Sequence, residues 1–347
     1  MISDCNIQIS EQEYRDLDYP SYSLLSSISK QGLDVLSGVK TNFFQLKFGS
    51  LVDDMCFEPS KLSNYYRGKA DSVITGNPKK IIDIVLDKVA IKGSKTVLDA
   101  HSNKIVSSAR KLNVYAKYSD QKVLDTILVD KNRVYFADKL NSMGKIHIKD
   151  EMWQMAEEAA NTLKTHDFTR VYFDKNDGME LIYQYKFVVN LYGTNVKGML
   201  DCLVIDHENK TIYPVDLKTG ESPADMFDEV MLLHKYYLQA SLYRLAMLEI
   251  VRQDADLAGY TVSNFEFVYL SKLNVYKPTI WVVPDDLYQA GLDGFTDRFG
   301  FKHKGIKELL RLYNDYIDNG NLYEKEVFNN EGRRFLSNLI KNEDEEI

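Results

Sequence analysis

Three polar residues, Asp201, Asp216 and Lys218, combine the side-chain types and the spacing that hydrolysis of a phosphodiester requires. Asp201 lies inside the apolar run GMLDCLVID, where a charge is costly to bury without a partner or a metal. Asp216 and Lys218 flank Leu217 in YPVDLK, and the two-residue period of a strand places both polar side chains on one face. Leu217 is then expected to point to the opposite, packed face.

A short turn at HENK joins the two expected strands, so Asp201 and Asp216 are predicted to lie side by side, roughly 5 Å apart at Cβ. Two carboxylates at that distance repel each other, and a divalent cation reverses the sign of the interaction. Mg²⁺ fits best, because it takes one or two carboxylates and completes its shell with water and phosphate oxygens. We expect Mn²⁺ to substitute for it.

Beside such an ion, the Lys218 ammonium would orient or activate the attacking water, or stabilise charge on a phosphorane-like transition state. The structural alternative is that this Asp-x-Lys triplet lies on a solvated strand edge and does no chemistry. The apolar surroundings of Asp201 and the separation of the two acidic residues favour the metal site.

Gln239 and Tyr243 are four residues apart in YYLQASLY, so they share one face of the helix expected there. Placed over the metal site, an amide and a phenol could hold a phosphate backbone or support Lys218. The alternative is a core tyrosine beside a polar helix edge.

Together these segments resemble the PD-(D/E)xK nuclease superfamily, and within it the phage-type and RecE-like exonucleases (exodeoxyribonuclease VIII-like). KGMLDCLVID is similar to the G-x-x-D strand of that family, YPVDLKTG to its (D/E)-x-K strand and YYLQASLY to its Q-x-x-x-Y helix. Near the N-terminus, SYSLLSSI and FGSLVDDMCFEP resemble its opening helix and its G-x-x-x-H-x-x-x-x-E-P segment. The order of the motifs is more specific than any one of them.

The resemblance implies that Asp201, Asp216 and the carbonyl of Leu217 bind the catalytic metal, and that Lys218 assists the nucleophilic water. It also implies that Gln239 and Tyr243 support the site or the DNA.

Two positions depart from the family pattern. Asp53 stands where relatives often have a metal-binding His, and it either supplies oxygen to Mg²⁺ or is a helix-surface acid beside Asp54. Gln184 stands where many relatives place a Glu, and Glu180 is one strand period too far to be assigned in its stead.

Composition excludes several classes of protein. The 347 residues carry a formal net charge of −8, which argues against a broad basic surface but not against a local groove, since bound Mg²⁺ neutralises carboxylate clusters. The three cysteines have neither CxxC spacing nor an even count, so we expect a reducing compartment and no zinc or iron–sulfur site. No signal sequence or membrane span is evident, so we expect a soluble protein of a bacterial or phage-infected cytoplasm.

The periodicity predicts an α/β (α+β) fold in which helices flank a central mixed sheet, and the resemblance implies that its core is PD-(D/E)xK, restriction-endonuclease-like. Three regions are expected: an N-terminal helical part of the core at residues 1–60, a helical insertion at 61–165, and the sheet with C-terminal helices at 166–347. Strands are predicted from about Arg170 through an Asn-Asp-Gly turn and onward to Gly220, followed by one helix from Ser222 to about Glu249 and two more strands.

The leading hypothesis is therefore a Mg²⁺-dependent deoxyribonuclease, more an exonuclease than an endonuclease, acting in phage or bacterial DNA recombination or repair. The expected partner is DNA, in particular linear double-stranded DNA. The resemblance leaves room for a single-strand annealing or recombination partner protein and for a homo-oligomer, and no membrane partner is expected. The alternative is a catalytically inactive PD-(D/E)xK-like DNA-binding or assembly protein. Action on RNA or a small nucleotide ranks lower, because no aromatic-rich RNA-binding segment stands out.

Overall fold

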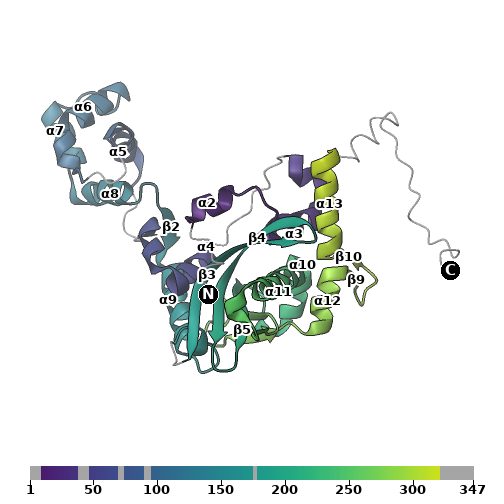
Figure 1. Ribbon diagram of the computed structural model, residues 1–347. Coiled ribbons are helices and arrows are strands. Elements are labelled where there is room, and N and C mark those ends of the chain that lie inside the picture. The colour runs from purple at the N-terminus through teal and green to yellow at the C-terminus, as the bar shows by residue number, and fades with distance from the viewer. Residues whose placement is uncertain (1–8, 38–46, 69–73, 90–94, 175–177, 321–347) are drawn as a thin grey trace. The chain divides into compact units, whose positions relative to one another are not determined.

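The computed structural model describes residues 9–37, 47–68, 74–89, 95–174 and 178–320. The chain divides into two compact units, one formed by residues 1–44 and 164–347 and the other by residues 45–163. The first unit contains the six-stranded sheet and the second is mainly helical (Figure 1). Residues 45–60, which the predicted regions grouped with the core, belong to the second unit.

The second unit buries its own apolar cluster between four helices, with Ile81, Val85, Ile105 and Phe136 among the fully buried side chains. A parallel pair of short strands within it, β1 and β2, had no counterpart in the helical prediction. The elements of this unit are α4 (Lys47–Phe57), β1 (Tyr65–Gly68), α5 (Gly76–Val89), α6 (Ser102–Lys111), α7 (Asp120–Ile127), α8 (Asp130–Asn141), β2 (Ile146–Lys149) and α9 (Asp150–Thr165), whose last two residues cross into the other unit.

The sheet-containing unit has a mixed sheet flanked by helices, as the sequence predicted. Its strands run in the order β3-β4-β5-β7-β8, and β6 also pairs with β5. The pairs are antiparallel except β5 with β6 and β5 with β7, which are parallel. These strands are β3 (Met179–Leu191), β4 (Thr194–Asp206), β5 (Thr211–Gly220), β6 (Thr261–Val262), β7 (Glu266–Ser271) and β8 (Thr279–Val282).

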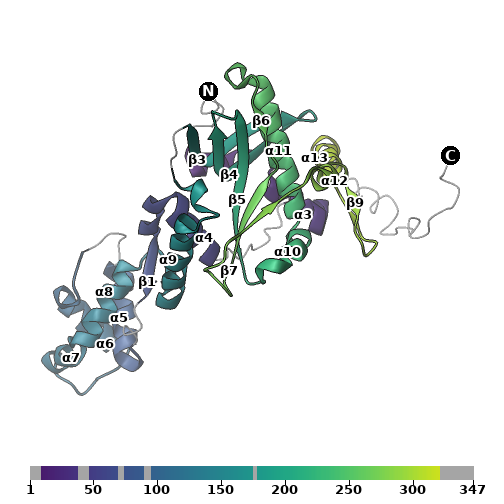
Figure 2. The ribbon, with the colours of Figure 1, turned by 90° about the horizontal axis from the view of Figure 1, so that it is seen from below.

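Helices of the same unit complete its core. They are α2 (Glu11–Asp16), α3 (Tyr22–Gln31), α10 (Phe227–His234), α11 (Tyr236–Gln253), α12 (Asp285–Asp293) and α13 (Ile306–Asn319), with a small hairpin of β9 (Phe295–Thr296) and β10 (Lys302–His303) between the last two. Figure 2 shows α11 lying along one face of the sheet. Its Leu238 and Leu242 are fully buried in one cluster with Phe187 and Phe267 of the sheet and Leu25 of α3. No described helix is both long and apolar enough to cross a bilayer.

Local chemistry explains where the chain differs from the predicted elements. Arg170–Tyr172 forms a 3-10 helix and not a strand, so the meander has three strands. A two-residue turn with positive φ at Tyr192 and Gly193 joins β3 to β4, which matches the twist of antiparallel strands. The single helix expected from Ser222 is interrupted at Lys235, whose left-handed φ of 61° ends α10 and starts α11 in a new direction.

Two neighbouring residues of β4 fix the N-terminal helices and the core beneath them. Lys197 is buried, and its Nζ donates to the carbonyls of Tyr14, Arg15 and Leu17 at 2.6–3.0 Å, where α2 ends. A cation at the C-terminus of a helix satisfies its last carbonyls and its dipole. Gly198 pairs with Phe187 across the sheet and leaves room for its ring.

Replacing Gly198 with alanine is expected to destabilise the sheet-containing unit by about 1–3 kcal/mol, the cost of overpacking a core. An ideal Cβ at this position would lie 2.1 Å from Phe187 Cζ, and the Phe187 ring is fully buried. Urea denaturation followed by circular dichroism measures the change. Asn195→Ala, at an exposed position on the same strand, is the control and should stay within about 0.5 kcal/mol of wild type. Equal unfolding midpoints for Gly198→Ala and wild type would contradict the packing described here.

Candidate functional site

The antiparallel register of β4 and β5 brings Asp201 and Asp216 together. Cys202 pairs with Val215. Asp201 precedes Cys202 and Asp216 follows Val215, so the antiparallel register places the two aspartates opposite each other. Asp201 Oδ2 accepts a hydrogen bond of 2.8 Å from the Leu217 N–H, so its carboxylate reaches across to the β5 backbone beside Asp216. The two acidic side chains therefore lie on neighbouring strands and close enough to interact.

An irregularity in the sheet coincides with Asp201. Tyr185 pairs with Leu200 and Tyr183 with Cys202, while Gln184 between them has a left-handed φ of 51°. Leu200 and Leu203 both belong to the core under α11, so the alternation of faces shifts by one residue between them. A strained backbone at a polar position often marks a functional site. Here it turns the Gln184 amide toward Asp201, with Nε2 3.4 Å from Oδ1.

Lys218 lies on the same face of β5 as Asp216 and forms an ion pair with its Oδ2. The ammonium also stands 4.8 Å from the ring centre of Tyr236 and 5.9 Å from that of Phe267, distances at which a cation is attracted to an aromatic face. Leu217 is buried, but it does not belong to the hydrophobic cluster that lies beneath α11. The strand thus presents its polar residues to the helix and packs Leu217 on the other side.

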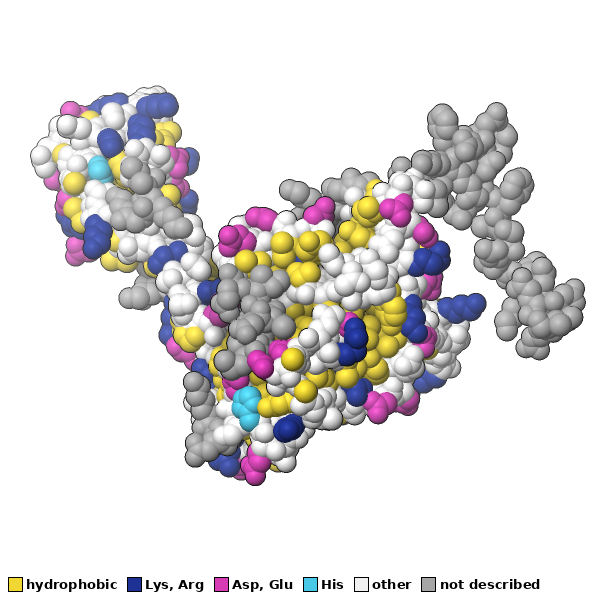
Figure 3. Space-filling model, viewed as in Figure 1, with side chains coloured by type: hydrophobic (Ala, Val, Ile, Leu, Met, Phe, Trp, Pro, Cys, Tyr) yellow, Lys and Arg dark blue, Asp and Glu magenta, His cyan; other side chains and the backbone are white. Residues whose placement is uncertain are grey.

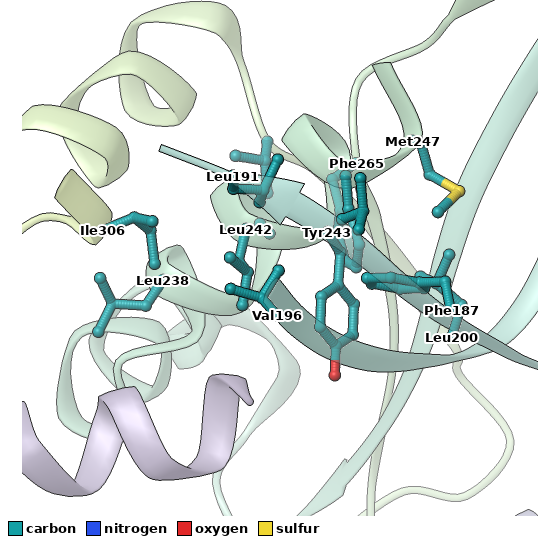
Figure 4. Close-up of a cluster of buried hydrophobic side chains, with 14 of the residues drawn as sticks. Phe187, Leu191, Val196, Leu200, Leu238, Leu242, Tyr243, Met247, Phe265 and Ile306 are labelled. Carbon is teal, nitrogen blue, oxygen red and sulfur yellow. The ribbon is translucent and has the colours of Figure 1, made fainter. Parts of the chain in front are cut away.

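Helix α11 contributes the second polar layer. Gln239 is 4% exposed, and its Nε2 donates a 2.6 Å hydrogen bond to Asp216 Oδ1. Tyr243, one turn further along, is 6% exposed and packs edge-to-face on Phe187, with ring centres 5.5 Å apart. Figure 4 shows its ring within the apolar cluster and its hydroxyl extending past the labelled side chains. Gln239 therefore holds an acidic residue directly, while Tyr243 supports the helix and the strand from the core.

Burial dominates the electrostatics of this group. It raises the pKa of Asp201 to about 7, helped by the nearby Asp216 carboxylate and opposed by Lys218. Burial also raises the pKa of Asp216 against the opposing effect of Lys218 and Gln239. For Lys218 burial alone lowers the pKa, but the Asp216 carboxylate, the Tyr236 phenol and Asp201 outweigh it and raise the pKa above its usual value. Near neutral pH the cluster holds the ion pair between Lys218 and Asp216, and the Asp201 carboxyl is close to its pKa.

Asp53 and Glu180 were also singled out in the sequence. Asp53 is on α4, in the unit formed by residues 45–163, and is partly exposed. Glu180 pairs with Ile205 in the sheet, and its carboxylate contacts His207 at 3.3 Å. It takes no part in the contacts described for Asp201.

Sequence reasoning missed two members of the group. Tyr236 lies three residues before Gln239 and so on its helix face, which was a detectable signal. Tyr22 of α3 donates a hydrogen bond of 2.9 Å to the carbonyl of His234, just before that face begins.

The donor chemistry of the cluster fits a hard divalent cation. Two carboxylates and a strand carbonyl match what Mg²⁺ accepts from a protein, although no group of three His, Cys, Asp or Glu side chains that could hold a metal occurs within the described residues. Gln239 Oε1 is buried without a hydrogen-bond donor, and an unsatisfied buried oxygen calls for a ligand or water. Asp201, Asp216 and Leu217 are thus the residues that could hold such an ion.

Comparison with protein-family models and with curated proteins finds no match. Among solved structures, the chain is similar to a candidate exonuclease from Eubacterium rectale, with a TM-score of 0.39 and 12% identity over 94% of this chain and 89% of the other. It is also similar to the protein SSO0001, with a TM-score of 0.24 and 11% identity over 70% of this chain and 86% of the other. At these TM-scores neither likeness carries an argument about function.

The raised pKa of Asp201 predicts that, without divalent ions, stability falls as pH rises. The folded state holds its proton up to about pH 7, whereas an aspartate in the unfolded chain loses it near 4, so the proton's stabilising contribution is complete below about pH 4 and lost as pH passes 7. Urea denaturation of wild type and Asp201→Asn in EDTA tests this. The amide cannot ionise, so the variant should gain on wild type between pH 5 and pH 8. Parallel pH profiles for the two proteins would contradict the assignment.

Proposed function

We propose that the chain is a metal-dependent nuclease that hydrolyses DNA phosphodiester bonds at the Asp201, Asp216 and Lys218 cluster. The observation that carries this proposal is the pairing of the buried Asp216 carboxylate with the partly buried Asp201 carboxylate on the neighbouring strand, with the Lys218 ammonium beside them. Burial of such a group is costly, and a divalent cation with a bound phosphate would compensate the remaining negative charge. The motif order noted in the sequence supports the same reading.

Each residue of the cluster has a distinct task in this proposal. Asp201, Asp216 and the Leu217 carbonyl would hold Mg²⁺, with Mn²⁺ as a substitute. When bound, the ion supplies charge neutralisation of the phosphate and a more acidic water. Gln239 fixes the Asp216 carboxylate by its 2.6 Å hydrogen bond, so that this ligand does not have to reorganise.

Lys218 acts in this scheme as a fixed positive charge. Its ion pair with Asp216 and its position over the Tyr236 ring hold it as an ammonium, so it donates hydrogen bonds and does not accept a proton. It is suited to orient the attacking water or to stabilise the extra negative charge on phosphorus oxygens in the transition state. In the resting cluster, Asp216 keeps it in place.

We further propose that the enzyme works from ends of linear double-stranded DNA, in recombination or repair. The support is the similarity of the sequence motifs to those of phage-type exonucleases. The second candidate function is DNA binding without cleavage. It is favoured by the Gln184 amide beside Asp201, where a further acidic ligand would strengthen the metal site.

Digestion of linear and covalently closed circular duplex DNA with Mg²⁺, Mn²⁺ or EDTA tests the function. Wild type should shorten linear DNA only with a divalent ion. Asp216→Asn and Lys218→Ala should lose at least roughly a hundredfold in rate, because one removes a metal ligand and the other removes transition-state charge stabilisation. Asp216→Asn keeps an acceptor for Gln239, so its fold should survive.

Glu180→Gln is the matched control, since it removes a carboxylate from the same sheet outside the cluster, and its rate should equal that of wild type. Cutting of the circular substrate at a similar rate would reveal an endonuclease. Intact DNA under all conditions, with binding retained, would establish the non-cleaving alternative. Full activity of Asp216→Asn would dismiss the site.

A further inference from the structure

The β9–β10 hairpin exposes two large aromatic side chains next to positive charges. Phe299 and Phe301 are 66% and 67% exposed, on either side of Gly300. Arg298 precedes the first and Lys302 follows the second, giving the run Arg-Phe-Gly-Phe-Lys. Figures 1 and 2 both show this hairpin projecting beside α12. Large apolar side chains exposed close together in one turn make this hairpin a candidate binding surface.

The hairpin is internally braced, so it presents these rings in a defined way. Asp297 Oδ1 accepts hydrogen bonds of 2.9 Å from the backbone N–H groups of Phe299 and Phe301, and its Oδ2 lies 2.8 Å from His303 Nε2. Gly300 takes the left-handed φ of 86° that the turn requires. The turn that carries the aromatic side chains is therefore held by side-chain hydrogen bonds.

The charges that remain on the hairpin are positive. Asp297 is engaged with His303, which lowers its pKa, and Lys304 is paired with Glu308. Neither Arg298 nor Lys302 forms an ion pair within the described part of the chain. The Arg298 guanidinium lies 4.9 Å from the Phe299 ring centre, which leaves its charge at the surface. Aromatic faces flanked by unpaired cations suit a ligand that is both planar and anionic.

The hairpin is attached to the helix that lines the candidate site. Phe295 packs edge-to-face on Tyr237 with ring centres 5.1 Å apart, and Lys235 Nζ lies 2.9 Å from His303 Nδ1. Tyr236, which lies between Lys235 and Tyr237 in the sequence, places its ring under the Lys218 ammonium. The aromatic surface and the acidic cluster are thus both fixed to the first turn of α11.

A hollow of about 640 Å³ lies behind the hairpin, with Phe295 and Phe299 on one side and Met231 and Leu287 among its other apolar walls. Figure 3 shows hydrophobic side chains gathered on the face of this unit, with charged groups among them. Asp228 and Glu229 also line the hollow. Asp297 and Arg298 line it as well. The carboxylates repel phosphate and accept hydrogen bonds from amino groups, so the acidic and apolar lining suits a base, while the Arg298 guanidinium suits a phosphate.

We propose that this hairpin binds single-stranded DNA, with unpaired bases stacking on Phe299 and Phe301 and phosphates contacting Arg298 and Lys302. The inference rests on the proposed action on DNA and adds the strand-holding surface to it. Paired bases hide their faces inside a duplex, so the stacking surfaces select an unpaired strand. A strand bound here lies beside the helix that holds Asp216.

Binding of a fluorescein-labelled oligothymidylate in EDTA, measured by anisotropy, tests the proposal without cleavage. The double variant Phe299→Ala with Phe301→Ala should weaken binding by at least roughly tenfold, because each base stacked on an aromatic side chain contributes substantially to affinity. Phe168→Ala is the matched control, since Phe168 is also 66% exposed in the same unit but is flanked by Asp167 and Thr169. Its affinity should equal that of wild type.

Two further measurements separate stacking from charge. Replacing Arg298 and Lys302 with glutamine should reduce the slope of log affinity against log salt by about 1.4, the value for two phosphate contacts on a single strand. In a Phe301→Trp variant, which keeps an aromatic face, the oligonucleotide should quench the new indole emission and bind as tightly as to wild type.

Unchanged affinity in the double phenylalanine variant, or no binding by wild type, overturns the proposal. It is also overturned if sedimentation shows that this variant dissociates an oligomer while still binding the strand, because the hairpin would then contact another copy of the chain. If wild type cuts no DNA but binds the oligonucleotide, and the double phenylalanine variant loses that binding, the nuclease function is wrong and this inference stands. If wild type cuts DNA and the hairpin variants bind and cut as well as wild type, the nuclease function stands and this inference is wrong.

Discussion

The sheet-containing unit is organised around two aspartates that the pairing of β4 with β5 holds close together. Asp201 and Asp216 occupy adjoining strands, with Asp216 buried and Asp201 partly buried, so each carboxylate needs a partner. The Leu217 N–H, the Gln239 amide and the Lys218 ammonium supply those partners. Two of these donors belong to β5, one from its backbone and one from a side chain, and the third is a side chain of α11. The position of the helix over the sheet and the charge of the cluster therefore depend on each other.

Much of this cluster followed from the periodicity of the sequence. Polar residues two apart in YPVDLK are sufficient to place Asp216 and Lys218 on a common face, and the short turn that joins the strands is sufficient to bring Asp201 beside Asp216. The Gln239 and Tyr243 spacing likewise determined a common helix face. These predictions rely on side-chain alternation, which is local and strong in β-rich segments.

The features that escaped prediction depend on contacts distant in sequence. Nothing about glutamine favours the left-handed backbone of Gln184, whose φ is 51° in the folded sheet. Lys235 also has positive φ, and the break it makes between α10 and α11 is fixed by contacts such as that with His303. The β9–β10 hairpin has only two residues in each strand, too few for an alternating pattern to show.

The interrupted layout of the sheet-containing unit has a consequence for how the chain matures on the ribosome. Leu25 and Ile28 of α3 pack into a cluster whose other buried members begin at Tyr185, and residues 45–163 are synthesised in between. At bacterial and eukaryotic translation rates, that interval lasts on the order of ten seconds. The intervening unit is continuous in sequence and can complete its own core during this time. The first helices to emerge are therefore among the last to be buried, and their apolar faces are the surface that nascent-chain chaperones would meet.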